Sequence, residues 1–380
     1  MRRLTLVMTH QCNFDCKYCL QKHEDVFMPV ELGEKAIERM RQELLSESSR
    51  KDSSDRSSDD PEETSSTKVQ ISFYGGEPLL ARDRIEHLVK YANERIGGMP
   101  GYSVRYEITT NGLLLDESFL SFAKKNRILL ALSHDGLAQD QVRLARGGKP
   151  TREIVDQKLE MLLRAFPETI IMMTIHPDYV DQVADSIAFF HEKGIRSVSL
   201  VPAHGERVSW TEEKFRRFSQ QMEKVKVLYE RWNQGDGYFR VIPFENKIRN
   251  YIRQKDADSA MCHFGCHKLM VDADGKYYPC SHFIGRDGFC IGSVEDDVDE
   301  AKIRTLESRR VEPEICRACD LRFRCRHTCA CANHGHTGSM AEVSALQCEY
   351  EKLTIRLADE AAAAMIREEN PRFVERMYKP

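Results

Sequence analysis

Three cysteines near the N-terminus have the spacing of a metal-cluster site. Cys12, Cys16 and Cys19 form C-x3-C-x2-C in the stretch THQCNFDCKYCLQ. Three thiolates on one short loop can hold three irons of a [4Fe–4S] cluster, which leaves the fourth iron without a protein ligand. An open coordination position is typical of a metal site that does chemistry. A zinc knuckle or three buried thiols would have the same spacing, so the triplet alone leaves both alternatives open.

A second group of ten cysteines lies between Cys262 and Cys348. The total of thirteen is odd, and a chain of 380 residues without an export signal is not a disulfide scaffold, so we expect reduced thiols. The pattern is C-x12-G-x4-C, then C-x2-C-x5-C-x3-C, then a last cysteine, and its residues are Cys262, Gly275, Cys280, Cys316, Cys319, Cys325, Cys329 and Cys348. Close, repeated spacings are typical of metal or cluster ligands, with a zinc ribbon as the alternative.

The stretch FYGGEP at residues 73–78 is the third feature that could do chemistry. Glycines let main-chain atoms come close to a ligand, and a carboxylate neutralises a cation. By itself this stretch would form a turn as readily as a binding site. Because it ends a predicted strand, it favours a site for a positively charged group.

The composition is that of a globular chain with room for two or three domains. Hydrophobic residues make up 41% and charged residues 31% of the chain, which is normal for a protein that buries a core. No stretch approaches the roughly 20 apolar residues of a membrane span, and no secretory signal begins the chain. With 56 basic and 60 acidic residues, the charge gives no reason to expect nucleic-acid binding. We expect a cytoplasmic protein that binds neither membrane nor nucleic acid.

Short apolar strands alternate with amphipathic helices over the first 200 residues. The predicted strands are Leu4–Met8, Val69–Tyr74, Val104–Thr109, Ile128–Ser133, Ile170–His176 and Ser197–Pro202. The predicted helices cover residues 31–45, 82–95, 116–125, 152–165, 180–193 and 211–232. Such alternation gives a parallel sheet. We predict an α/β fold, an open partial (β/α)6 TIM-like barrel with its chemistry at the C-terminal ends of the strands.

Changes in composition divide the rest of the chain. Residues 46–66 hold nine serines and seven acids with no apolar residue, which predicts a disordered surface insertion, with a regulatory segment as the less favoured alternative. Beyond about residue 235 the regular periodicity fades. We predict a barrel over 1–235, a small cysteine-rich domain over 236–350, and a C-terminal helix and tail over 351–380.

The triplet, the FYGGEP stretch and the strand–helix alternation together resemble the radical S-adenosylmethionine (SAM) enzymes. In that family C-x3-C-x2-C follows the first strand and holds a [4Fe–4S] cluster whose open iron chelates SAM. Reduction of the cluster splits the sulfonium and gives a 5′-deoxyadenosyl radical. The family's fold is also a partial barrel, so the resemblance agrees with the fold predicted from the elements.

The resemblance also implies a set of SAM contacts. Gly75, Gly76 and Glu77 correspond to the family's GGE motif, which binds the SAM ammonium. Segments after the third and fourth strands imply contacts to the ribose and carboxylate, and an aromatic residue before the third cysteine implies an adenine contact. The residues implied are Tyr18, Asn111, Ser133, Arg143 and, near the end of the sixth strand, Leu200, with Arg146 as the alternative to Arg143.

The C-terminal cysteines resemble the SPASM domain of radical SAM enzymes. The resemblance implies two auxiliary [4Fe–4S] clusters, hence three clusters in the chain. The ligands implied for the first are Cys262, Cys266, Cys280 and Cys329, and those for the second are Cys316, Cys319, Cys325 and Cys348. Cys290 and Cys331 are left over, and Cys331 could exchange roles with Cys329.

The function implied is a radical SAM oxidoreductase that removes hydrogen from a ribosomally made peptide and forms a thioether or other cross-link. Its partners would be a precursor peptide or protein and an external electron donor of flavodoxin or ferredoxin type. The alternatives are an anaerobic sulfatase maturase, which makes formylglycine, and a non-catalytic iron–sulfur or zinc scaffold. The FYGGEP stretch argues against a scaffold, which needs no site for the SAM ammonium.

One position separates the two enzymatic alternatives. SPASM enzymes that mature sulfatases carry an Asp base directly after the cysteine that ends G-x4-C, and this chain has Ser281 there. A hydroxyl is a weak base without an activating partner, whereas a metal-bound thiolate needs none because the metal already holds it deprotonated. We therefore expect cross-linking ahead of formylglycine formation and assign no catalytic residue. Because the triplet begins at residue 12, we also expect no fused leader-binding domain.

Overall fold

The computed structural model describes residues 2–54, 67–205, 207–252, 268–368 and 370–378. All six predicted strands are present, as β1 (Arg2–Thr9), β3 (Thr67–Gly75), β4 (Tyr102–Thr110), β5 (Ile128–Ser133), β7 (Ile170–Ile175) and β8 (Ser197–Pro202). They pair in parallel in that order. The predicted α/β fold with an open parallel sheet is confirmed.

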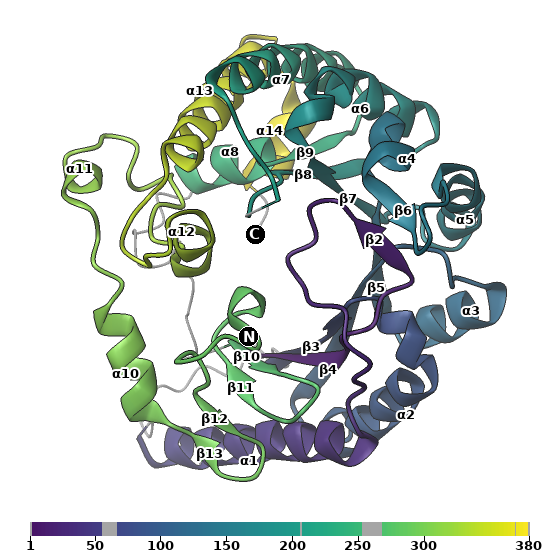
Figure 1. Cartoon of the computed structure of the whole chain (residues 1–380), viewed down its shortest axis with the longest axis vertical. Helices are drawn as coiled ribbons and strands as arrows, with labels where there is room; N and C mark the ends of the chain where they lie inside the picture. The colour runs from purple at the N-terminus through teal and green to yellow at the C-terminus, as the bar shows by residue number, and fades with distance from the viewer. Residues whose placement is uncertain (1, 55–66, 206, 253–267, 369, 379–380) are drawn as a thin grey trace.

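The predicted helices are also present and lie outside the sheet. They are α1 (Val30–Ser54), α2 (Arg82–Ala92), α3 (Glu117–Lys125), α5 (Arg152–Ala165), α6 (Val183–Glu192) and α7 (Glu212–Trp232). Figure 1 shows them following one another around the strands, from α1 at the bottom to α7 at the top. One face of each helix is buried against the strands, as Ile37 and Leu44 of α1 illustrate. This is the 3.6-residue periodicity on which the helix predictions depend.

The sheet continues at both ends beyond the six predicted strands. β9 (Arg240–Ile242) pairs in parallel with β8, and β10 (Lys268–Val271) pairs in parallel with β1. β11 (Tyr277–Tyr278) is antiparallel to β10, and the full order is β11-β10-β1-β3-β4-β5-β7-β8-β9. The C-terminal cysteine region is therefore joined to the barrel through the edge of β1.

Shorter elements complete the fold. Ahead of the C-terminal region they are β2 (Phe14–Cys16), η1 (Pro78–Ala81), η2 (Asn93–Gly97), η3 (Gly136–Ala138), α4 (Gln139–Val142), β6 (Arg143–Ala145), η4 (Pro177–Gln182) and α8 (Phe244–Ile252). In that region they are η5 (Ser281–Phe283), β12 (Gly292–Ser293), β13 (Asp297–Val298), α10 (Glu300–Ser308), α11 (Glu314–Arg317), α12 (Ala330–Thr337), α13 (Ala345–Arg367) and α14 (Pro371–Tyr378).

Two predictions about helix bounds are corrected by the structure. The prediction of a disordered insertion is wrong for residues 46–54, which continue α1. Residues 55–66 lie outside the described residues. Extending a helix that has already formed adds one hydrogen bond for each residue fixed, so a polar stretch can follow an anchored one. The closing helix, expected from residue 351, begins at Ala345, because the Ser344 hydroxyl caps it by accepting the Gln347 N–H.

No helix in the described part of the chain is long and apolar enough to cross a membrane.

Candidate active site

The cysteine triplet follows β1 at the C-terminal edge of the sheet, and the end of β3 holds its loop in place. The Gly76 N–H donates to the Thr9 carbonyl at 3.0 Å, and the Glu77 N–H donates to the Gln11 carbonyl at 2.8 Å. A Cβ on Gly76 would lie 2.2 Å from the Gln11 oxygen. A Cβ on Gly75, whose φ is +148°, would lie 2.3 Å from the Thr9 oxygen. The two glycines are therefore needed for the loop to pack against the sheet.

The three thiols of the triplet lie close to one another, with Cys12 buried and Cys16 and Cys19 half-buried. Burial raises the pKa of Cys12 to about 11 and that of Cys16 to about 12, and the neighbouring Cys19 thiol adds to both shifts. The Cys12 sulfur accepts the Phe14 N–H at 3.4 Å, and the Cys19 sulfur lies 3.5 Å from Nε2 of His23. Cys12 and Cys16 therefore keep their protons at neutral pH unless a bound metal displaces them. Their arrangement fits the [4Fe–4S] cluster that the spacing implies.

Glu77 is a buried carboxylate beside the triplet loop. It accepts hydrogen bonds from the Thr110 hydroxyl at 2.7 Å, the Asn111 N–H at 2.8 Å and the Leu79 N–H at 3.1 Å. Burial raises its pKa even though these three bonds oppose the shift. A carboxylate has about four acceptor positions, so one remains for a ligand cation. This is the group that the resemblance assigns to the SAM ammonium.

Asn111, after β4, joins Glu77 to the triplet. Its side-chain amide donates to the Asn13 side-chain oxygen at 2.6 Å and lies 3.8 Å from the Cys12 sulfur. Its own side-chain oxygen accepts the Leu113 N–H at 3.1 Å, which fixes the orientation of the amide. The structure thus brings together four predicted site residues, Gly75, Gly76, Glu77 and Asn111, and the first cysteine.

A second group of predicted residues surrounds Asp135, which sequence reasoning did not assign. The Tyr18 hydroxyl donates to the Asp135 carboxylate, and Nε of Arg143 lies 2.8 Å from it. The Thr174 N–H donates to the other carboxylate oxygen at 2.8 Å. Burial opposes the charge of Arg143, but the Asp135 carboxylate holds the pKa of the guanidinium above its usual value. Strand pairing sets Arg143 opposite Cys16, so the group borders the triplet.

The remaining predicted SAM residues lie on the strands themselves. Ser133 is the last residue of β5, two positions before Asp135. Leu200 is buried in β8, and its carbonyl accepts the Tyr350 hydroxyl of α13 at 3.0 Å. Leu200 therefore also joins the barrel to the C-terminal helix, and its adenine contact stays a prediction.

Tyr74 is a residue that sequence reasoning missed. Burial raises its pKa, hydrogen bonds with Gln21 and Ser281 oppose that shift, and the Cys19 and Cys280 thiols add to it. Its hydroxyl therefore lies between the triplet loop and the C-terminal cysteine region. The sequence offers one signal for Tyr74, which stands directly before the two glycines. It thus lies at the C-terminal end of a strand, where the active-site residues of such barrels are found.

Three C-terminal thiols lie in contact. The Cys280 sulfur is 3.2 Å and the Cys329 sulfur 3.6 Å from that of Cys331. A hydrogen bond from Cys331 lowers the pKa of Cys329. Cys331 thus lies beside Cys280 and Cys329, which are two of the four predicted ligands of the first auxiliary cluster. Cys262 and Cys266, the other two predicted ligands, lie outside the described residues.

The thiols of the second predicted cluster set influence one another. Burial raises the pKa of Cys316, and the Cys348 and Cys319 thiols add to that shift. Burial also raises the pKa of Cys325 to about 12, with smaller contributions from neighbouring groups that include the Cys316 thiol. The four thiols are therefore neighbours.

An ion pair joins Lys247 of α8 to Glu351 of α13, both buried. Its two members also bind the loop that carries Cys325. The Lys247 ammonium donates to the Arg324 carbonyl at 2.8 Å, and Glu351 accepts the Arg326 N–H at 2.9 Å. This network positions the third cysteine of the set without a metal.

Over the described residues, no three His, Cys, Asp or Glu side chains converge closely enough for a single metal ion.

With this geometry established, known proteins were compared with the chain. Residues 6–190 match the family model described as "Radical SAM superfamily". A curated relative, the cysteine-type anaerobic sulfatase-maturating enzyme of Clostridium novyi, is 23% identical over 244 residues, which are 60% of this chain and 62% of that protein. The chain thus matches somewhat less than two thirds of that relative's length.

Two solved structures share the fold over most of the chain. The first is native anSMEcpe with bound AdoMet and Kp18Cys peptide, with a TM-score of 0.72, 20% identity, and coverage of 95% of this chain and 99% of that one. The second is Streptococcus suis SuiB bound to the precursor peptide SuiA, with a TM-score of 0.60, 17% identity, and coverage of 91% and 75%. At these identities the likeness establishes the fold.

Proposed function

The chain carries a radical SAM domain and is an enzyme of radical SAM chemistry, and on this premise we propose that it modifies a ribosomally made peptide by forming a thioether or related cross-link. Both solved structures described above contain a bound peptide, which supports a peptide substrate. The auxiliary clusters, their ligands, the SAM contacts and a location in the cytoplasm belong to the same proposal. So do the domain bounds at 1–235, 236–350 and 351–380.

The proposed roles of the residues follow from their placement. Cys12, Cys16 and Cys19 hold the first cluster, Glu77 receives the SAM ammonium, and the group of Tyr18, Asp135 and Arg143 borders the same edge. When bound, the cluster and SAM supply a 5′-deoxyadenosyl radical. The protein's own contribution is to exclude water around the thiols and to fix the orientation of the polar groups before the substrate arrives.

The choice of reaction rests on the contact between the hydroxyl groups of Ser281 and Tyr74. The residue after Cys280 is a serine, and its side chain meets the Tyr74 hydroxyl rather than presenting a carboxylate. Neither hydroxyl is a strong base at neutral pH. A substrate thiolate bound to a cluster requires no base, so this site suits cross-linking better than formylglycine formation.

Formylglycine formation is the second candidate. The curated relative described above is a sulfatase-maturating enzyme, and one of the two solved structures is anSMEcpe. This second candidate predicts that the enzyme converts a sulfatase-derived Cys peptide.

The test is to offer both substrates to the same reconstituted enzyme under anaerobic conditions. One is a short peptide encoded beside this chain, the other a sulfatase-derived Cys peptide, and each is followed by mass spectrometry. We expect loss of two hydrogens from the neighbouring peptide and an unchanged sulfatase peptide. Formylglycine in the sulfatase peptide, with the neighbouring peptide unchanged, would reverse the ranking.

A further inference from the structure

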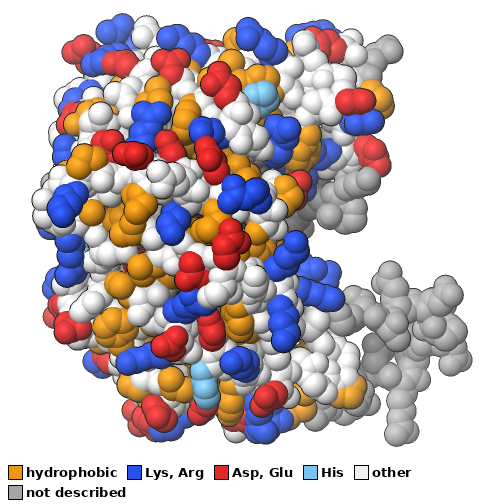
Figure 2. All heavy atoms as spheres, turned by 90° about the vertical axis from the view of Figure 1, so that its right-hand side faces the viewer, with side chains coloured by type: hydrophobic (Ala, Val, Ile, Leu, Met, Phe, Trp, Pro, Cys, Tyr) orange, Lys and Arg blue, Asp and Glu red, His pale blue; other side chains and the backbone are white. Residues whose placement is uncertain are grey.

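Three histidines from three separate segments meet between the barrel and the C-terminal cysteine region. His204 follows β8, His282 belongs to η5, and His336 belongs to α12. The ring centres of His204 and His282 are 5.3 Å apart with the rings nearly parallel, and those of His204 and His336 are 4.7 Å apart. Figure 2 shows another face of the molecule, on which histidine side chains lie apart from one another. We call the three residues the histidine cluster.

The loop that carries His204 is fixed in place beside the cysteine triplet. The Trp210 indole N–H donates to the carbonyl of Ala203 at 2.8 Å. A Cβ on Gly205 would lie 2.4 Å from a methyl carbon of Leu20, the residue directly after the triplet. The loop after β8 therefore packs on the triplet loop, and its one histidine is held close to the proposed SAM cluster.

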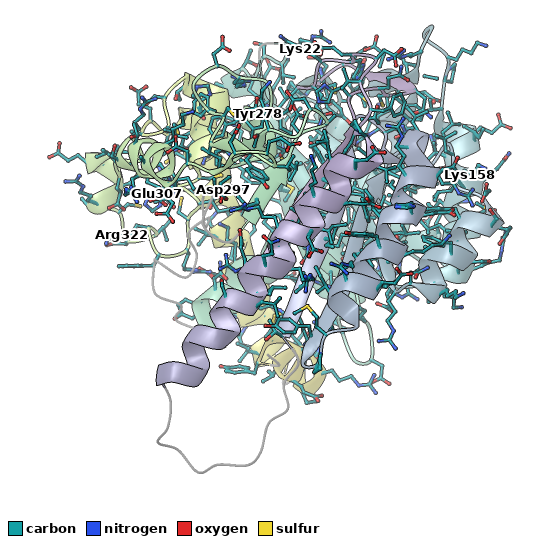
Figure 3. All side chains as sticks on the ribbon, turned by 90° about the horizontal axis from the view of Figure 1, so that it is seen from below. Lys22, Lys158, Tyr278, Asp297, Glu307 and Arg322 are labelled. Atoms are coloured by element: carbon teal, nitrogen blue, oxygen red, sulfur yellow. The ribbon has the colours of Figure 1, made fainter. Side chains whose placement is uncertain are left out.

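The histidine cluster also reaches the first auxiliary cysteine set. His282 stands two residues after Cys280. Figure 3 shows Lys22, just beyond the triplet, and Tyr278, just before Cys280, toward the same upper side of the molecule. Hydrogen bonds of the Tyr74 hydroxyl join the same two segments. The cluster therefore spans the region between the triplet and the C-terminal cysteines, where the proposed function places the substrate.

His204 is unprotonated at neutral pH. The titratable groups that face it are His282 and His336, and burial lowers its pKa without help from any charged neighbour in the described part of the chain. Burial and the nearby His204 lower the pKa of His336 to about 4. Nδ1 of His204 is buried beside Gly335 and has no hydrogen-bond partner among the described residues, while the residue as a whole is half-buried. A neutral imidazole in this position can accept a proton.

We propose that His204 is a catalytic residue that accepts the proton released by a substrate thiol. The S–H bond of a cysteine in the peptide breaks, its electron pair stays on sulfur, and an N–H bond forms at the free ring nitrogen of His204. No electron is transferred, so the step needs no oxidant. His282 and His336 are positioning residues, because their rings pack against that of His204. The proposal rests on the proposed function, which requires a substrate thiolate.

An acceptor of this strength fits cross-linking. A free thiol has a pKa of about 8.5, so an imidazole of lowered pKa accepts its proton poorly. A thiol that binds a metal becomes acidic without a base, but the proton that it releases still needs an acceptor. The negative charge of the new thiolate then stabilises the imidazolium. A weakly basic histidine therefore suffices here.

The first measurement counts protons and does not depend on turnover. Reconstituted holoenzyme with SAM but no reductant is titrated at pH 7.0 with the short peptide encoded beside this chain, by calorimetry in two buffers of different ionisation enthalpy. The wild type should release little proton to the buffer, because His204 retains it, whereas His204→Gln should release about one proton per peptide. The same peptide with serine in place of cysteine should release none from either protein.

The second measurement follows the rate of peptide modification. His204→Gln should lower this rate about 100-fold at saturating peptide with little change in the KM for the peptide, because a proton transfer is lost and not a binding contact. Added imidazole should restore at least about a tenth of the wild-type rate to His204→Ala, since the free base can occupy the vacated space. His87→Ala, at a side chain that is 51% exposed on α2, is the control and should change neither measurement. Iron content reports on the integrity of each variant.

A variant of a positioning residue serves if the His204 variants lose iron. In the wild type the rate should fall as the pH drops through the pKa of His204, which must be neutral to accept a proton. A carboxylate beside the ring raises that pKa, so His336→Asp should move the acidic limb of the pH profile upward by about one pH unit. A purely structural role of the histidine cluster would not move it.

Equal proton release by the wild type and His204→Gln, with no rescue of His204→Ala by imidazole, would overturn His204 as the acceptor and leave the proposed function standing. An acidic limb that stays in place in His336→Asp would overturn it as well. Equal modification of the cysteine and serine peptides by the wild type would instead contradict the proposed function, because no thioether can form without the thiol. The two failures are therefore distinguishable.

Discussion

The edge of the barrel and the C-terminal cysteine region both gather thiols, but the fold positions them differently. At the barrel edge, the triplet loop hydrogen-bonds to the end of a nine-residue strand, and Glu77 and Asp135 are fixed by three partners or more. In the C-terminal region the strands beyond β10 are two residues long and α11 has four residues. The sheet therefore holds the first site in place, whereas the C-terminal region has little regular structure of its own, and we expect bound clusters to stabilise it.

We expect the largest effect from removal of a triplet cysteine. Cys16→Ala should abolish SAM cleavage, because the cluster proposed to bind SAM loses one of its three protein ligands. It should leave about two thirds of the iron, since two of the three proposed four-iron clusters lie elsewhere. Iron analysis and 5′-deoxyadenosine formation measure the two effects. Cys290→Ala, which changes a cysteine outside the predicted ligand sets, is the matched control. Iron near zero in Cys16→Ala would contradict separate sites.

Removal of bound metal should affect the stability of the two regions differently. After chelation we expect backbone amides of residues 268–350 to exchange hydrogen much faster, while those of β3, β4 and β5 stay protected. The reason is that cluster binding supplies folding free energy where the hydrophobic core is small. Hydrogen exchange followed by mass spectrometry measures it. Equal loss of protection in both regions would mean that the barrel edge also depends on its cluster.

A glycine at the strand end gives the next largest effect. Gly76→Ala should cost most of the SAM cleavage activity, because its Cβ would lie 2.2 Å from the Gln11 oxygen and would push the triplet loop off β3. Gly97→Ala is the control, since the nearest atom to its Cβ is 3.9 Å away. Activity and iron content are measured for both. Normal activity in Gly76→Ala would show that the loop tolerates displacement.

The buried ion pair beside the triplet gives a smaller effect that distinguishes stability from binding. Asp135→Asn leaves Arg143 buried beside a neutral side chain, a change expected to cost about 3–5 kcal/mol of folding free energy and to raise the KM for SAM. Asp178→Asn, at an exposed pair with Lys214, should cost at most about 1 kcal/mol. Denaturant unfolding and SAM kinetics separate the two. An unchanged KM would remove Asp135 from the SAM site.

The sequence predicts the scaffold well because strand and helix periodicities report directly on burial. All six strands and all six barrel helices lie where their apolar residues predict them. Short elements are missed: β2 and β6 have three residues each, too few for a periodicity, and their pairing connects Cys16 with Arg143 across more than a hundred residues. The ends of α1 and α13 were also misplaced, because helix propagation and a serine cap set them rather than an apolar pattern.

Within the site, the grouping of Cys12, Cys16 and Cys19 is predictable because their spacing is local. The contact of Cys331 with Cys280 joins residues 51 positions apart and is not predictable from a local pattern. The role of Asp135 is also not predictable, because its partners Tyr18, Arg143 and Thr174 come from three separate segments of the chain. The same holds for Tyr74, whose neighbours belong to the triplet loop and to the C-terminal region. Contacts of this kind exist only after the sheet has formed, so no local pattern encodes them.

Peptide modification by a radical SAM mechanism requires transfer of a hydrogen atom from the peptide to the 5′-deoxyadenosyl group, which isotope labelling measures. The reconstituted enzyme, dithionite and SAM are incubated with a uniformly deuterated form of the short peptide encoded beside this chain, and the 5′-deoxyadenosine is analysed by mass spectrometry. We predict 5′-deoxyadenosine that carries one deuterium and a peptide that has lost two hydrogen isotopes. 5′-Deoxyadenosine without deuterium, beside an unmodified peptide, would contradict the account of a peptide-modifying radical SAM enzyme.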